Sequence, residues 1–137
     1  MVLFSTQIIS PKSYDEVYAI IKAAAYRNAR ASFSESSFSI VCMRRNVGVI
    51  QEHSRISGTL EKRSDSTVVN FHLHAGIGFW IGVAFAAIGA IESIATLVHQ
   101  SLGWHIPLLV FAAGAFVCAR YYWEGKGHIE RMLAKIK

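Results

Sequence analysis

The sequence predicts an α+β domain followed by a two-helix transmembrane hairpin, the domain being one helix on an antiparallel sheet of about four strands. Three observations lead to this fold class. Two long apolar segments, 76–98 and 104–123, lie close together in the C-terminal half. Residues 1–75 instead alternate with the periods of strands and of one amphipathic helix. The chain has 137 residues, of which 53% are hydrophobic and only 17% are charged, against ~25% charged in average soluble proteins.

The first elements of the domain are predicted to be a strand and a helix. Residues 2–9 alternate weakly between polar and apolar side chains, which favours a strand. Ser10 and Pro11 then open a helix, because serine caps the free amides of a first turn and proline tolerates the first helical position. Ser13 and Glu16 have the spacing of a second capping pair.

The rest of the domain is predicted to form the other strands of the sheet. The helix should fade near residues 29–31, and from Ser37 the apolar period changes to two. Two polar clusters, 44–48 and 63–66, are expected to be turns. A domain of this size buries a marginal core, so we expect it to lean on the hairpin or on neighbouring subunits. The alternating apolar residues are Phe38, Ile40, Cys42, Ile56, Leu60, Val69, Phe71 and Leu73.

The segment 76–98 has the length and composition of a membrane-spanning helix. At ~1.5 Å per residue it reaches about 34 Å, enough to cross a hydrocarbon core about 30 Å thick. Its one charged residue is Glu92, and it has no polar face. The segment 104–123 is the second predicted span, with Pro107 in its first turn, where a missing amide costs little. The alternative is a helical hairpin buried inside a larger soluble complex.

The distribution of charge predicts the orientation of the hairpin. The connection 99–105 forces an antiparallel turn and contains none of the 14 Lys and Arg residues of the chain. All of them lie in 1–75 and 120–137, so the positive-inside rule places both termini in the cytoplasm. Residues 124–137 are predicted to be a basic cytoplasmic tail, an amphipathic helix that lies on the inner leaflet.

Glu92 is the most informative residue of the predicted spans. A carboxylate at that depth is costly unless it meets water or a partner. Three interpretations stay open: a ring of Glu92 side chains lining a cation pathway, a protonated or hydrogen-bonded Glu92 that holds helices together, and a span that ends before Glu92. The other candidate polar or pore residues, each within about one helical turn of Glu92, are Gly89, Ser93 and Thr96.

A stripe of small residues runs along the first span beside Glu92. Its packing candidates are Gly78, Gly82 and Ala86, and the two glycines form a GxxxG motif. We expect this stripe to pack against small residues of the second span. The alternative is that it packs between subunits or lines a narrow pore.

Clusters of basic residues in the domain indicate binding of an anionic ligand, binding of anionic lipid, or only the charge bias that orients the hairpin. Guanidinium groups at a turn can grip phosphates, which indicates a nucleotide or an oligonucleotide. The alternative is attraction to anionic lipid headgroups. No aromatic residues interleave the arginines as they would on a surface that stacks bases. The candidate residues are Arg27, Arg30, Arg44, Arg45, Lys62 and Arg63.

Other chemistry-bearing residues are sparse. His72 and His74 share one face of a strand, but two ligands do not make a metal site, so neither a metal nor a cofactor is expected. No nucleophile is paired with a base, so an enzyme is not expected. Cys42 and Cys118 fall in different segments and are expected to stay reduced.

A family resemblance adds to these expectations. The stretch Ile56-Ser-Gly-Thr-Leu-Glu, then Ser66-Thr-Val-Val-Asn-Phe and a span, resembles small bacterial membrane proteins. In layout the chain is also similar to small two-span membrane effectors of bacterial antiphage defence, in which a cytoplasmic nucleotide-sensing domain is fused to a few spans. This resemblance implies an effector or ion channel of the bacterial inner (plasma) membrane, gated by its cytoplasmic domain.

Two spans cannot enclose a pore alone, so a channel requires a homo-oligomer of at least about four subunits among membrane lipids. The alternative is a non-enzymatic accessory or scaffold subunit of a larger membrane complex, docked through the small-residue stripe.

Overall fold

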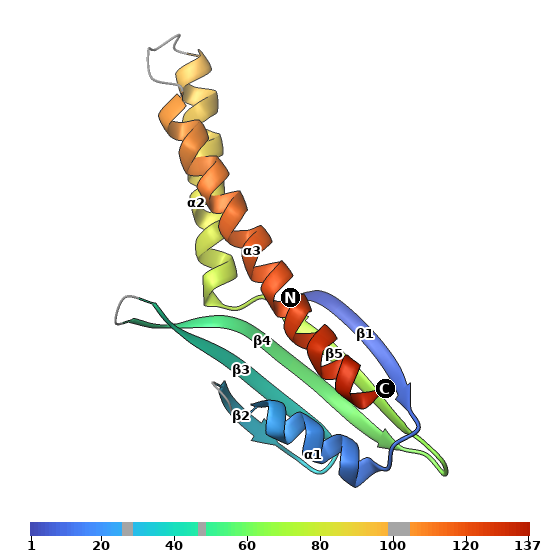
Figure 1. Ribbon diagram of the computed structural model, residues 1–137. Coiled ribbons are helices and arrows are strands. Elements are labelled where there is room, and N and C mark those ends of the chain that lie inside the picture. Colours follow the sequence, from blue (N-terminus) through green and yellow to red (C-terminus); the bar gives the residue numbers. More distant parts are fainter. Residues whose placement is uncertain (26–28, 47–48, 99–104) are drawn as a thin grey trace. The chain divides into compact units, whose positions relative to one another are not determined.

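The structure is a computed structural model that describes residues 1–25, 29–46, 49–98 and 105–137. It divides into two compact units. The sheet unit comprises residues 1–76 and 122–137, and the hairpin unit comprises residues 77–121. The elements in chain order (Figure 1) are β1 (Val2–Ser10), α1 (Tyr14–Ala25), β2 (Ala29–Phe33), β3 (Ser37–Asn46), β4 (Val49–Lys62), β5 (Thr67–His74), α2 (Ile77–Val98) and α3 (His105–Ile136).

The strands of the sheet unit form one antiparallel sheet in the order β1-β5-β4-β3-β2 (Figure 1). From β2 to β5, strands that follow one another in the chain pair directly. β1 pairs with β5, so the first and last strands in the chain lie side by side in the sheet. The predicted architecture of a helix on an antiparallel sheet, followed by two long apolar helices, is therefore confirmed.

The sheet has five strands, one more than predicted, because the sequence pattern did not reveal β2. This strand is short, and its alanine and serine residues are weak strand formers. Its Phe33 packs edge-on against Tyr18 of α1, with ring centroids 5.5 Å apart. The turn predicted at 44–48 is also wrong in part, since residues 44–46 belong to β3. Residues 47–48 lie outside the described part.

The N-terminus of α1 uses the second of the two predicted capping sites. The Ser13 amide donates to Glu16 Oε2 at 3.0 Å, and the Glu16 amide donates to Ser13 Oγ at 3.4 Å. The hydrogen bonds from Ser13 lower the pKa of the Glu16 carboxyl. Ser10 does not cap this helix, because it is the last residue of β1 and the helix begins only at Tyr14. Its hydroxyl accepts from the Lys12 amide at 3.2 Å and donates to the carbonyl of Ile136 at 2.7 Å.

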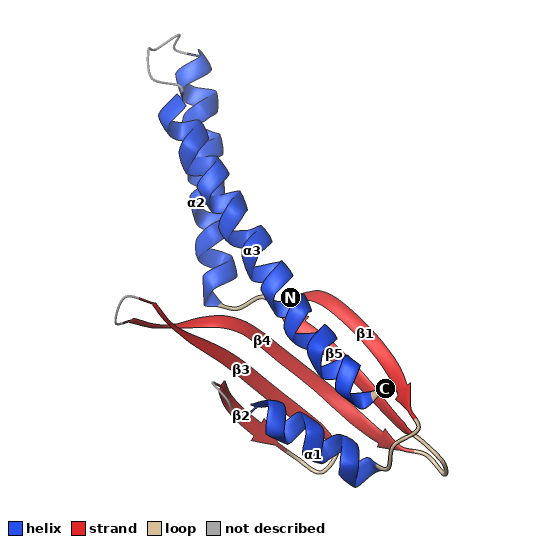
Figure 2. Ribbon diagram, in the orientation of Figure 1, coloured by secondary structure: helices blue, strands red, loops and turns tan. Residues whose placement is uncertain are grey.

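The last turns of α3 pack on the same face of the sheet as α1 (Figure 2). Ile129 and Ile136 are fully buried there, and Met132 is nearly so. Gly125 allows the close approach, because a Cβ atom at this position would lie 2.5 Å from Leu73 Cδ1. The expectation that this segment rests its apolar face on a lipid leaflet is therefore wrong, since that face is buried against the sheet.

The connection between β1 and α1 fastens the C-terminal end of α3. Ser10 donates to the Ile136 carbonyl, and the Lys12 ammonium donates to the carbonyl of Lys135. Thr67 Oγ1 in turn donates to the Lys12 carbonyl at 3.0 Å. The last carbonyls of a helix lack partners within the helix and carry partial negative charge, so a hydroxyl and an ammonium group stabilise them.

The hairpin unit contains α2 and the first half of α3. By length and composition, α2 and α3 are each long and apolar enough to cross a membrane. The most apolar windows of the two helices have mean hydropathies of 2.0 and 1.4. Only 11% and 17% of these windows are buried, unlike the core helix of a soluble protein. The second predicted span and the helix predicted in the tail are one continuous helix that ends at Ile136, and the hairpin unit ends within it at Tyr121.

Candidate functional site

Glycines hold the two helices of the hairpin unit in backbone contact. A Cβ atom on Gly89 would lie 2.3 Å from the Phe111 nitrogen, and one on Gly114 would lie 2.3 Å from the Ala86 nitrogen. Gly82 approaches α3 similarly, with 2.7 Å between its Cβ position and the nearest side-chain atom. Only glycine permits such approaches. The small-residue stripe therefore faces the second apolar helix of the same chain, which was the packing interpretation.

Three of the four candidate pore residues form hydrogen bonds or packing contacts within the hairpin unit. Ser93 Oγ donates to the Gly89 carbonyl at 2.6 Å, and Thr96 Oγ1 donates to the Ser93 carbonyl at 3.0 Å. Hydroxyls bonded to their own helix need no water and no partner in an apolar environment. Gly89 is buried against α3. Gly78, from the packing candidates, lies half-buried near the start of α2.

Glu92 differs from these residues, because it lies on the exposed side of α2. Ile81, Phe85 and Ile88 precede it on the same side, at alternating steps of four and three residues, and each is about half exposed. Such steps place side chains along one seam, as in coiled coils. We call these four residues the Glu92 seam. Among the residues that the structure describes, none forms a hydrogen bond or an ion pair with the Glu92 carboxylate.

The structure does not bring the predicted anion-binding residues together. Arg30 is exposed on the edge strand β2, whereas Lys62 and Arg63 lie at the turn between β4 and β5. The Arg63 Nε atom lies 3.9 Å from Glu61 Oε1, and an exposed pair of this kind contributes little. The remaining three candidates lie outside the described part, either wholly or in their side chains: Arg27, Arg44 and Arg45.

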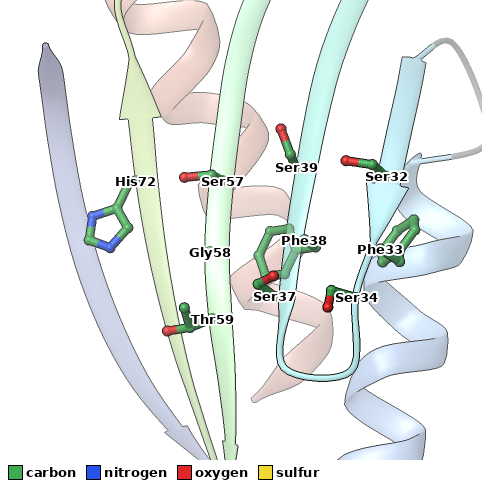
Figure 3. A pocket seen from close by; sticks show the side chains of 10 residues that line it. All are labelled: Ser32, Phe33, Ser34, Ser37, Phe38, Ser39, Ser57, Gly58, Thr59 and His72. Carbon is green, nitrogen blue, oxygen red and sulfur yellow. The ribbon is translucent and has the colours of Figure 1, made fainter.

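The face of the sheet opposite α1 contains a hollow of about 410 Å³ that the sequence analysis did not find (Figure 3). Four of its lining residues stand side by side across β2, β3, β4 and β5. They are the serines Ser32, Ser39 and Ser57, with His72 at the β5 end. We call these four residues the hydroxyl row, after the three serine hydroxyls. Ser34, Ser37 and Thr59 line the hollow beside this row. Hydroxyl residues at alternate positions of successive strands were the signal in the sequence that would have indicated this hollow.

Serine hydroxyls form hydrogen bonds with the two histidines on the β5 side of the hollow. Ser5 of β1 extends the hydroxyl row, with 3.0 Å between its Oγ atom and His72 Nδ1. Ser57 Oγ lies 2.7 Å from His74 Nε2. Burial lowers the pKa of His74, and the nearby charge of His72 lowers it further, so the His74 ring is neutral at pH 7.

The described residues offer little for covalent or metal chemistry. Burial raises the pKa of the Cys42 thiol, which keeps it protonated at neutral pH. The described part of the chain has no group of three or more His, Cys, Asp or Glu residues that could hold a metal ion.

Comparisons with protein-family models and with curated proteins find no match to this chain. Two features of the described residues bear on function: the Glu92 seam of the hairpin unit and the hollow of the sheet unit.

Proposed function

We propose that this protein is an oligomeric membrane effector or ion channel whose sheet unit senses an anionic ligand and gates the apolar helices. One observation carries the proposal: the carboxylate of Glu92 lies on an exposed apolar seam and has no partner among the described residues of its own chain. In lipid this arrangement is costly. Packed against the same seam of other copies, the apolar residues would be buried and the carboxylates would meet at a hydrated axis.

The number of subunits follows from the size of the hairpin. Two helices cannot enclose a pathway, so at least about four copies are required, related by a rotation that closes the ring. The exposed apolar side chains on the rest of α2 and α3 would then contact lipid. Those exposed by roughly half or more include Trp80, Ile91, Ile94, Leu97, Leu109 and Phe116.

The sheet unit holds both ends of the hairpin, which supports gating. β5 leads into α2 through only Ala75 and Gly76. α3 is one continuous helix, and its far end is fixed to the sheet by burial of Ile129 and by the hydrogen bond from Ser10. A ligand that changes the sheet would therefore act on both apolar helices.

The distribution of charge supports an orientation with both termini in the cytoplasm, and the bacterial inner membrane is the location that the resemblance to antiphage effectors implies. The connection between the apolar helices lacks Lys and Arg, whereas both flanking segments carry them. The layout of an α+β domain fused to a short hairpin resembles that of the antiphage effectors named above, and a role in defence is proposed on this resemblance.

The glycine contacts weigh against the alternative of an accessory subunit. That hypothesis used the small-residue stripe as a docking face for a larger complex. Gly82 and Gly89 instead contact α3 of the same chain, so the stripe is already covered. A leucine at either position would disrupt the hairpin itself, whatever the function of the protein.

Cation flux through vesicles that contain the purified chain tests the proposal. The Glu92→Gln variant removes one charge per subunit from the pathway, and we expect flux to fall about tenfold, which corresponds to ~1.4 kcal/mol. The matched control is Glu130→Gln, the same exchange at an exposed position of the sheet unit. A native mass spectrum should give four or more copies of the 15.2 kDa chain. Unchanged flux would remove the pore role of Glu92, and a monomer or dimer would remove the channel.

A further inference from the structure

The floor of the hollow is made of unusually short polar side chains for a sheet. Solvent-facing strand positions favour β-branched and aromatic residues, which cover the backbone. Here Ser32, Ser39 and Ser57 stand next to one another on three paired strands (Figure 3). Short side chains lower the surface along this line and leave hydroxyls that both donate and accept hydrogen bonds. The result is a depression whose floor carries hydroxyls with which a hydroxylated ligand could exchange hydrogen bonds.

Two arginines lie beyond one side of this floor, outside the lining of the hollow. Arg30 on β2 and Arg55 on β4 are both placed opposite Val41 of β3 by the strand register. They lie two residues along their strands from Ser32 and Ser57, and therefore about 7 Å from the hydroxyl row and on the same face. Because one strand separates them, their backbones are about 9.5 Å apart, a span that long arginine side chains can close around one anionic group.

Among the described side chains, positive and negative charges lie on opposite sides of the hydroxyl row. Arg30 and Arg55 lie on one side of the hydroxyl row. Glu61 lies on the other side, near the end of β4, and Glu35 lies in the turn between β2 and β3. An anionic group is therefore favoured at the arginine side, and uncharged hydroxyls are favoured over the floor.

The aromatic residues of the hollow do not face its opening. Phe33 packs on Tyr18 of α1, and Phe38 packs on Phe71 with ring centroids 5.4 Å apart. Within the described residues this face thus presents no Phe, Tyr or Trp on which bases of an oligonucleotide could stack. The volume of about 410 Å³ falls within the ~300–1,000 Å³ of small-molecule sites.

From these observations we infer that the hollow binds a soluble phosphorylated sugar, the class to which nucleotides belong. The arginine pair holds the phosphate, and the hydroxyl row with Thr59 holds the sugar. This inference rests on the proposed function, because it names the site and the chemical class of the ligand that the sheet unit senses.

Isothermal titration of the detergent-purified full chain tests the inference, with ribose 5-phosphate and adenosine monophosphate as probes. Ribose and inorganic phosphate each carry half of the chemistry, and we expect both to bind at least tenfold more weakly. Arg55→Gln and Arg30→Gln remove charge-assisted hydrogen bonds, so each should raise the dissociation constant tenfold or more. Ser39→Tyr fills the hollow and should have a similar effect, whereas Ser39→Thr keeps the hydroxyl and should bind within threefold of the wild type.

The control is Arg63→Gln, the same exchange at the turn between β4 and β5, which should change affinity less than twofold. Circular dichroism of each variant establishes that the sheet is folded. No binding of either probe at millimolar concentration would overturn the inference. So would equal affinity in Ser39→Tyr, or binding only to vesicles that carry a phosphorylated inositol headgroup. None of these results changes the flux predicted for Glu92→Gln in vesicles, so the two proposals fail separately.

Discussion

Replacement of Ile129 by alanine tests whether the end of α3 belongs to the core of the sheet unit. Ile129 is fully buried. The exchange deletes roughly three carbons, which at ~0.8 kcal/mol each amounts to about 2.4 kcal/mol of lost burial. The cavity that remains adds to this loss, while the better helix propensity of alanine offsets it by roughly a few tenths of a kcal/mol. We therefore expect the free energy of unfolding to fall by about 2–4 kcal/mol, a large share of the ~5–15 kcal/mol typical of a domain.

Native-state hydrogen exchange measures the loss of stability in Ile129→Ala at the strands that α3 contacts. Amides of β5 and β4 should lose protection in Ile129→Ala, because these strands form the floor against which α3 packs. Glu130→Ala is the matched control, being one residue away and exposed, and should change stability by less than about 0.5 kcal/mol. A loss below 0.5 kcal/mol for Ile129→Ala, together with weaker binding to vesicles, would refute the packing argument. It would place the apolar face of this segment on lipid instead.

Three further exchanges test the hairpin unit, a control glycine of α3 and the histidine side of the hollow. Gly89→Leu should separate α2 from α3, because its Cβ position lies 2.3 Å from backbone, and the oligomer should be lost from a native mass spectrum. Gly127→Ala, which meets nothing within 4 Å, should keep assembly and raise stability by up to ~1 kcal/mol. The lowered pKa of His74 favours its neutral form in the folded state. Its contribution to stability is present above its usual pKa of 6.5 and is lost as the pH falls below that value. Urea midpoints from pH 7.5 to 5 should therefore decline less in His74→Gln than in the wild type, and parallel declines would contradict this.

Local spacing in the sequence determined the elements that depend on neighbours along the chain. The apolar run 76–98 predicted α2, because the length of such a run does not depend on the rest of the fold. The Ser13 and Glu16 pair predicted a helix start from two residues three apart. Alternation of apolar residues predicted the strands that contain Phe38, Ile56 and Phe71, whose inward faces form most of the core.

Only the tertiary structure decided how distant segments meet. The weak pattern of β2 became a strand because β3 pairs with it, and α3 continues to Ile136 because the sheet buries its last turns. The hydroxyl row joins Ser32, Ser39, Ser57 and His72 only through the register of four strands. Each of these residues alone is an ordinary polar position of a strand. A slip of one residue would move a strand's hydroxyls to the core face, so the candidate ligand site exists only in the register of the folded sheet.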